Sequence, residues 1–256
     1  MKKLLTFIAL ITISLQASAW SKFGHEIVVE VAKRHLTERT KANLAKYLPY
    51  DITLDAVWMD DHRKDDVIAY TTAWHVYELD DNLEYNPNPR LKKGGDAIYA
   101  LRVADYNLSR YREKCDSTVI FNTRMVLHFA GDMHCPTHAY IGGRCFWNCE
   151  LDGWKTQFHY IYDKMPALLN PDKTPAQVAA EIDNCKKGEI KRIQSGDLYE
   201  WVKHSAVNVK KAYDLNPRGK YHLDPNTVEL SRGFVTEQLR NAGYRLAFLL
   251  NKYFGE

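Results

Sequence analysis

The sequence predicts an all-α protein, a single mostly helical domain, and two observations support that class. Apolar residues recur at the three- and four-residue spacing of amphipathic helices along most of the chain. Long stretches of alternating polar and apolar residues, which are typical of strands, are absent. The composition, with 45% hydrophobic and 26% charged residues among 256, excludes a disordered or low-complexity chain.

The expected helices follow one another along the chain without an internal repeat or a long linker. Apolar periodicity predicts helices within residues 23–36, 98–108, 122–133, 198–212 and 234–253. A further helix begins at Thr174, because threonine caps the first turn, Pro175 suits the first helical position and Gln177 completes a capping box. Turn-rich breaks are expected at 85–89, 142–143 and 216–217.

Residues 1–19 have the pattern of a secretory signal peptide. A short positive segment is followed by a mostly apolar run over 4–15 and by a small-x-small cleavage pattern at 17–19. The alternative is a membrane anchor, but the apolar run is short, and no other stretch approaches the roughly 18 residues that a span needs. We therefore expect no membrane span. The signal peptide would direct export to the periplasm or the medium, and cleavage between Ala19 and Trp20 would release the domain 20–256.

Charge and cysteine content narrow the function classes. The 35 Lys and Arg residues nearly balance the 32 Asp and Glu residues, so the chain lacks the bulk positive field of a dedicated DNA-binding domain. The five cysteines form no paired CxxC unit of a thiolate zinc site. In an export route we expect a disulfide and a buried free thiol, and Cys145 and Cys149 are close enough in sequence to close a small loop.

Two histidine–aspartate pairs indicate a metal site. His128 and Asp132 are four residues apart on an expected helix, so both side chains leave one face, and His159 and Asp163 repeat this spacing. His138 follows soon after, where a proline ends the helix. Zinc binds both imidazole and carboxylate at ~2.0–2.2 Å, and a carboxylate can bridge two ions. A satisfied core residue is the alternative for any single histidine.

The expected new N-terminus offers further ligands. A free α-amine has a pKa of ~7.7–8.0 and can bind a metal once it is deprotonated. The Trp20 amine and carbonyl could then chelate one ion through a five-membered ring, and His25 could complete the set.

These segments resemble the S1/P1 nuclease family, zinc-dependent single-strand nucleases that share a fold with zinc phospholipase C. Residues 20–25 are similar to the family's W-G-x-x-G-H. Residues 126–138 resemble L-V-H-F-I-G-D-M-x-Q-P-L-H, with Cys135 in place of the glutamine. The matches to W-A-D-E-Y-R, L-H-F-I-D, N-L-H-x-x-W-D and G-Y-R-L-A are residues 58–63, 74–78, 157–163 and 243–247.

The resemblance implies a centre of three zinc ions. It assigns Asp60, His75, His128 and the bridging Asp132 to one ion, Trp20 and His25 with Asp132 to the second, and His138, His159 and Asp163 to the third. A hydroxide between the bridged ions would attack the phosphodiester, since zinc lowers the pKa of bound water from 15.7 to as low as ~7. Asp60 and Asp132 are the expected catalytic carboxylates, and Arg63 would grip phosphate oxygens.

Several positions depart from the family pattern. Val76 and Glu78 stand where the family often has an aromatic residue and an aspartate that hold a base, and a missing ring costs about 1–3 kcal/mol per base. Asn148 is the candidate polar contact in the segment that replaces a Gly-Gly-Asn loop. His134 and Cys135 either act as a fourth ligand or pack beside the cluster.

The expected function is that of an exported zinc endonuclease. It would cleave single-stranded DNA and RNA to 5′-phosphate products, and 3′-nucleotidase activity is an additional expectation. We expect a monomer without an obligate protein partner. The alternatives are a phospholipase C-like phosphodiesterase and a non-catalytic secreted zinc-binding protein. The short spacing from Trp20 to His25 and the final ligand Asp163 favour the nuclease.

Overall fold

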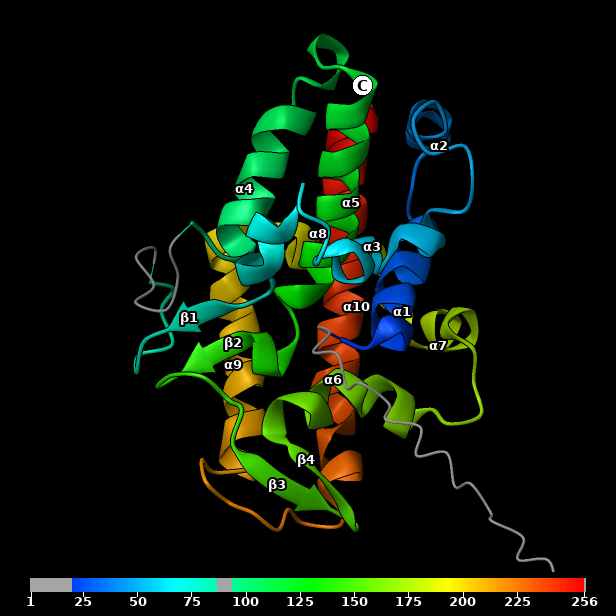
Figure 1. The fold of residues 1–256 in the computed structure, drawn as a ribbon. Helices are drawn as coiled ribbons and strands as arrows, with labels where there is room; N and C mark the ends of the chain where they lie inside the picture. Colours follow the sequence, from blue (N-terminus) through cyan, green and yellow to red (C-terminus); the bar gives the residue numbers. More distant parts are fainter. Residues whose placement is uncertain (1–19, 87–93, 256) are drawn as a thin grey trace, which may run out of the picture.

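The computed structural model describes residues 20–86 and 94–255, and most of them are helical (Figure 1). The α-helices are α1 (Lys22–Lys33), α2 (Glu38–Leu44), α3 (Trp58–His62), α4 (Ala97–Leu108), α5 (Asp116–Asp132), α6 (Phe158–Leu169), α7 (Pro175–Ile182), α8 (Lys187–Gln194), α9 (Leu198–Leu215) and α10 (Thr227–Phe254). Short 3-10 helices are η1 (Ile52–Asp55), η2 (Ala69–His75), η3 (Tyr111–Glu113) and η4 (Pro136–His138). The all-α class is confirmed. The predicted leader, and residues 87–89 of one predicted break, lie outside the described residues.

The long helix α10 forms the centre of the core. It runs the length of the molecule behind α5, with α1 and α9 on either side (Figure 1). Its 28 residues bury one side along most of their length against α1, α5 and α6. Gly243 allows the closest approach, because a Cβ there would lie 2.5 Å from Val31 of α1. This packing fixes α1, α5 and α6 relative to one another.

Local sequence signals set several helix starts. Thr174 and Gln177 form the predicted capping box of α7. Asp197 and Glu200 form a second capping box at the start of α9. In each box the side chains satisfy backbone N–H groups that the first helical turn leaves without partners.

The structure contains two small sheets that the sequence does not predict, and β3 and β4 lie at the lower end in Figure 1. Strand β1 (Tyr77–Leu79) pairs in parallel with β2 (Ala139–Ile141), with Tyr77 opposite Ala139. Strand β3 (Asn148–Leu151) pairs antiparallel with β4 (Trp154–Gln157). Strands this short carry too few alternations to stand out in a sequence. The first sheet brings the segment after His75 beside the segment after His138.

The disulfide expected from the sequence is not formed in the structure. All five cysteines are free thiols. The buried Cys145 thiol instead donates to the Thr137 carbonyl, with 3.0 Å from Sγ to oxygen. Among the described residues, no helix combines the length and apolar character that crossing a bilayer requires.

Candidate metal centre

Helices α1, α3, α5 and α6 approach one another in the molecule (Figure 1). Histidines and aspartates of these helices and of η2 and η4 converge there. The elements supply His25 from α1, Asp60 from α3, His75 from η2, His128 and Asp132 from α5, His138 from η4, and His159 and Asp163 from α6. All eight residues are buried. The structure thus brings together the predicted donor side chains.

Asp132 lies at the centre of the cluster. Its Oδ1 is 3.3 Å from His25 Nε2 and 3.7 Å from His138 Nδ1. Its Oδ2 is 3.0 Å from His75 Nδ1 and 3.3 Å from His128 Nε2. One carboxylate therefore faces imidazoles from four elements, which is the geometry of a bridging ligand.

Asp60 extends the cluster toward the surface. Its Oδ1 lies 3.5 Å from His75 Nδ1, and its Oδ2 lies 3.8 Å from His128 Nε2. The Arg63 guanidinium approaches the same carboxylate, with 3.6 Å from Nη1 to Oδ1. A positive charge therefore stands at the outer edge of the donor set.

Asp163 organises a second group of donors. Its Oδ1 is 3.6 Å from His138 Nε2, and its Oδ2 is 3.3 Å from His159 Nε2. The two histidine rings are stacked, with centroids 4.8 Å apart. Cys135 also reaches this group, since its Sγ is 3.8 Å from Asp163 Oδ1.

Gly131 of α5, which lies between His128 and Asp132, makes room for the His25 ring. The His25 ring stacks on the His128 ring, with centroids 4.1 Å apart and planes 12° apart. A Cβ on Gly131 would lie 2.7 Å from His25 Nδ1, closer than non-bonded atoms approach. Only glycine therefore lets the imidazole lie flat against the helix.

Backbone carbonyls fix three of the imidazoles. His128 Nδ1 donates to the Ala56 carbonyl at 2.9 Å, and His159 Nδ1 donates to the Thr137 carbonyl at 3.1 Å. His138 Nδ1 donates in a short hydrogen bond to the His75 carbonyl. Because a carbonyl only accepts, each ring carries its proton on Nδ1 and presents Nε2 to the cluster. This is the usual arrangement of metal-binding histidines.

Many buried nitrogen and oxygen atoms of the cluster that could bind a metal have no hydrogen-bond partner. They are both ring nitrogens of His25, both oxygens of Asp60, His75 Nε2, Asp132 Oδ1, His138 Nε2 and Asp163 Oδ2. Leaving such an atom buried and unpaired costs about 1–3 kcal/mol. The mixture of nitrogen and oxygen donors is the set that zinc accepts. The residues present thus fit a group of bound metal ions.

The pKa shifts differ from group to group in the cluster without bound ions, and three of the imidazoles are in the neutral form that binds metal. Burial lowers the pKa of His25 and of His159, and it lowers that of His138 to about 4, so these rings are neutral near pH 7. Burial also acts to lower the pKa of His128, but the Asp132 and Asp60 charges outweigh it and raise this pKa to about 9. Burial acts to raise the pKa of Asp132, yet the neighbouring histidines hold it well below its usual range.

Trp20 is fully buried beside the cluster. Its Cδ1 lies 3.7 Å from the position that a Cβ on Gly131 would take. The neighbouring Ser21 donates its backbone N–H to the Asp163 carbonyl at 2.7 Å. The start of the expected exported domain is thereby held between α5 and α6.

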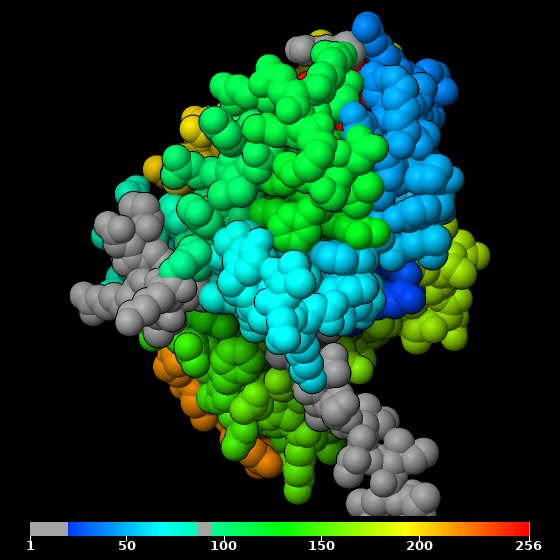
Figure 2. Space-filling view, turned by 45° about the horizontal axis from the view of Figure 1, so that its top comes forward, coloured from blue at the N-terminus to red at the C-terminus, as the bar shows by residue number. Residues whose placement is uncertain are grey.

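Asp60 and His75 are the most exposed residues of the cluster. Asp60 and His75 are 6% and 7% exposed, whereas His128 and Asp132 are at 0%. Figure 2 shows the segment that includes α3 and η2, in cyan, lying on the surface of this face. The Arg63 side chain, at 15% exposed, lies beside Asp60.

The residues expected to contact substrate lie on the two small sheets or directly before one of their strands. Val76 is half-buried and directly precedes β1. Glu78 is half-buried on β1, and its Oε2 has no hydrogen-bond partner. Asn148 is exposed on β3 opposite Gln157, the residue before α6. Val76 and Glu78 thus follow a cluster residue, while Asn148 lies on a separate sheet.

Two buried thiols flank the Asp163 group. Cys135 lies three residues before His138, and this spacing is the feature of the sequence that places the thiol near the cluster. Cys145 was one candidate for the expected disulfide, whose pairing the sequence left open, and in the structure its Sγ lies 3.4 Å from His159 Nδ1. No spacing in the sequence indicates that second contact.

A second buried polar region adjoins the end of α5. Arg245 of α10 donates from Nη1 to His134 Nε2 at 2.7 Å and from Nε to the Ile193 carbonyl at 3.0 Å. His134 Nδ1 donates to the Ala130 carbonyl at 2.7 Å. Gln238 donates to the His134 carbonyl at 2.7 Å. We call these residues the Arg245 network.

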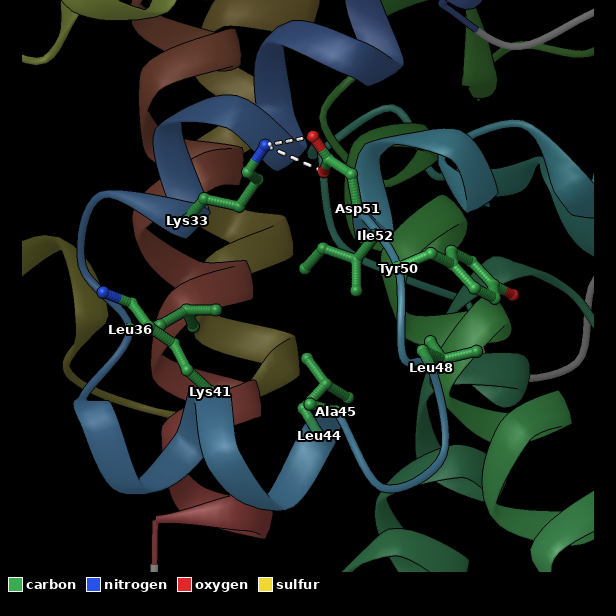
Figure 3. A pocket seen from close by; sticks show the side chains of 9 residues that line it. All are labelled: Lys33, Leu36, Lys41, Leu44, Ala45, Leu48, Tyr50, Asp51 and Ile52. Carbon is green, nitrogen blue, oxygen red and sulfur yellow. Dashed lines mark hydrogen bonds and ion pairs between the residues drawn. The ribbon is translucent and has the colours of Figure 1, made fainter.

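A separate pocket of about 360 Å³ lies at the other end of α1 (Figure 3). Apolar side chains of α2 and of the loop after it line most of it, and Lys33 at its rim is held by Asp51. The pocket therefore offers little of the chemistry of the metal centre.

The chain is similar to known proteins over most of its length. A family model described as S1/P1 Nuclease matches residues 20–255. Endonuclease 2 of Arabidopsis thaliana is 24% identical over 270 residues, covering 92% of this chain and 91% of the relative. The family match includes all the segments that supply the donor cluster.

Proposed function

Because this chain belongs to the S1/P1 nuclease family and is a nuclease, we propose that it is a zinc endonuclease acting on single-stranded DNA and RNA. The products would end in 5′-phosphate, and 3′-nucleotidase activity would accompany the cleavage. The family is zinc-dependent in general. The observation that carries the proposal is the cluster of buried donor atoms without partners around Asp132 and Asp163.

The proposed ligand set divides among three zinc ions. Asp132 would bridge the first two, since its two oxygens face different histidines. The first ion would take Asp60, His75 and His128, the second Trp20 and His25, and the third His138, His159 and Asp163. Bound zinc would supply hydroxide at neutral pH and neutralise charge on the phosphodiester.

The side chains around the cluster would position the substrate. The Arg63 guanidinium at the exposed edge can grip two phosphate oxygens in a fork, which orients the phosphodiester over Asp60 and Asp132. These two carboxylates would hold the reacting groups in place. We also propose that Val76, Glu78 and Asn148 contact the base of the bound nucleotide.

The depth of the cluster supports a single-stranded substrate. Its donors are 0–7% exposed, so a phosphodiester must enter the edge beside Arg63 to reach them. A DNA duplex is stiff over about 150 base pairs and does not fold a phosphate into such an edge. A single strand bends freely enough to do so.

We further propose that the protein is exported and matured by removal of residues 1–19. Cleavage after Ala19 would free the Trp20 amine beside the cluster and leave 20–256 as one catalytic domain, acting as a monomer. The burial of Trp20 and the hydrogen bond from Ser21 to Asp163 support this maturation.

Hydrolysis of denatured nucleic acid tests the proposal. We expect the matured protein to release 5′-mononucleotides from heat-denatured DNA and from RNA, and to release far fewer from intact duplex. A chelator should abolish the activity and added zinc should restore it. Turnover of a choline phospholipid instead would favour a phospholipase, and bound zinc without any turnover would favour a zinc-binding protein.

A further inference from the structure

We propose that Cys135 is a fourth protein ligand of the ion assigned to His138, His159 and Asp163. This position would then be a closed site with two nitrogens, one oxygen and one sulfur. The inference rests on the proposed function, because it presupposes that the cluster binds zinc.

The local backbone places the thiol on the side of the ligands. Cys135 directly precedes η4, and His138 is the last residue of that turn, so the two side chains lie three residues apart on one turn. The Cys135 side chain is fully buried. Its Sγ, His138 Nε2 or Nδ1 and an Asp163 oxygen all lie within 4.8 Å of one another.

The distances from the Asp163 oxygens to the neighbouring donors are close to those between ligands of one ion. Bonds of about 2.0–2.3 Å around a tetrahedral zinc place the ligand atoms roughly 3.3–3.6 Å apart. Asp163 Oδ2 is 3.3 Å from His159 Nε2, and Asp163 Oδ1 is 3.6 Å from His138 Nε2. The separation of 3.8 Å between Cys135 Sγ and Asp163 Oδ1 needs only a small adjustment.

Two of the donor atoms on this side lack a hydrogen-bond partner, whereas Cys135 Sγ and Asp163 Oδ1 also lie near the Thr137 hydroxyl. Asp163 Oδ2 and His138 Nε2 are buried without a hydrogen bond, which points to a ligand that the protein itself does not supply. When the sulfur–metal bond forms, the S–H bond breaks and its proton passes to solvent, as for other thiolate ligands.

The second thiol serves as an internal contrast. Cys145 Sγ lies 3.4 Å from His159 Nδ1, the nitrogen that bonds to the Thr137 carbonyl. The opposite nitrogen, Nε2, faces Asp163. Cys145 thus lies on the outer side of the His159 ring, where a sulfur supports the ring but does not reach the ion.

A fourth protein ligand changes the role of this ion. Structural zinc sites are closed by four protein ligands, whereas catalytic sites keep a position open for water or substrate. The closed site would tie η4 to α6 and exchange its ion slowly. Phosphodiester chemistry would then fall to the two ions that share Asp132.

Cobalt substitution tests the inference by spectroscopy. Metal-free matured protein loaded with Co²⁺ should show a near-ultraviolet thiolate-to-cobalt charge-transfer band as well as visible ligand-field bands. Cys135→Ser should lose the charge-transfer band and keep visible bands. Its affinity for the third ion should fall at least roughly tenfold, since changes to the supporting groups of a ligand alone cost about 10–100-fold. Cys145→Ser is the matched control and should keep the band.

The outcomes separate this inference from the proposed function. Visible bands without a charge-transfer band in the wild-type protein would overturn the cysteine ligand and leave the metal centre intact. Loss of the band in Cys145→Ser but not in Cys135→Ser would also overturn it. Failure to bind cobalt or zinc would refute both proposals. If Cys135→Ser does not fold, zinc X-ray absorption of the wild type decides, through the presence or absence of a sulfur shell at about 2.3 Å.

Discussion

Two buried polar regions meet at the end of α5, and they satisfy their polar atoms in opposite ways. In the Arg245 network, the guanidinium, the His134 ring and the Gln238 amide all donate to or accept from other protein groups. In the metal-donor cluster, whose Asp132 lies two residues before His134, Asp132 Oδ1 and both ring nitrogens of His25 have no hydrogen-bond partner. The comparison teaches that burial of polar groups alone does not mark a ligand site; incomplete pairing does.

The pKa values reflect the same contrast. Burial, followed by the Arg245 charge, lowers the pKa of His134 to about 3, so its ring stays neutral and accepts from the arginine. Burial lowers the pKa of Arg245 to about 10, which leaves it charged near pH 7. The network therefore has one settled protonation state and needs no ion.

Replacing Asp132 with asparagine should have the largest effect on activity. Asp132→Asn removes the proposed bridge, so kcat/KM on single-stranded DNA should fall on the order of 10³-fold. The metal-free variant should also lose stability near pH 7, because the low pKa of Asp132 shows that the folded state stabilises its charge beside the histidines. Steady-state kinetics and urea unfolding in chelator check the two halves. Full activity would contradict the proposed centre.

Replacing Arg245 with methionine should lower stability and leave the metal centre and the activity intact. Arg245→Met leaves His134 Nε2 and the Ile193 carbonyl without their donor, and unfolding in urea should show a loss of about 3 kcal/mol or more. Metal content and activity per folded molecule should persist. An unchanged free energy of unfolding, or loss of zinc from folded protein, would end the division into two regions.

The proposed N-terminal ligand gives a smaller and more specific test. A form that keeps one extra methionine before Trp20 has no free amine at that residue. We expect it to bind one zinc fewer and to lose about 10–100-fold in activity, since a ligand contact is removed while the fold remains. Metal analysis beside the correctly processed protein measures this. Equal zinc content in the two forms would exclude the Trp20 amine.

Lowering the pH should reduce the contribution of His134 in the Arg245 network to the free energy of unfolding. The folded pKa of His134, about 3, lies below its unfolded value of roughly 6.5. Its stabilising contribution is therefore complete above about pH 6.5 and declines as the pH falls toward the folded value. His134→Gln keeps an acceptor for Arg245 but does not titrate, so from about pH 6.5 to 5 it should lose about 1.5 kcal/mol less stability than the wild type. Equal losses in urea titrations would refute this.

The helices, and the donors that they carry, were accessible from the sequence. His128 with Asp132 and His159 with Asp163 follow from helical spacing, because residues four apart share a face. Asp60 and His75 came only from the family resemblance, since each stands in a short helix without a periodic pattern. The predicted helices are found in the structure, and the family is confirmed by the match over 20–255.

The remaining features depend on contacts between distant segments. The parallel pairing of β1 with β2 is too short to leave a pattern and joins segments about sixty residues apart. Cys145 was only a candidate for the expected disulfide, and sequence spacing cannot show that its thiol donates to the Thr137 carbonyl. The bond between Arg245 and His134 joins positions 111 apart and requires the packed fold.

Gly131 gives the cluster an unusual point of vulnerability. It supplies no donor atom, yet a single methyl group there would press on the His25 ring and push α1 away from α5. A search for inactivating changes that considered only titratable side chains would overlook it. The arrangement of imidazoles around Asp132 thus depends on a place where the chain has no side chain at all.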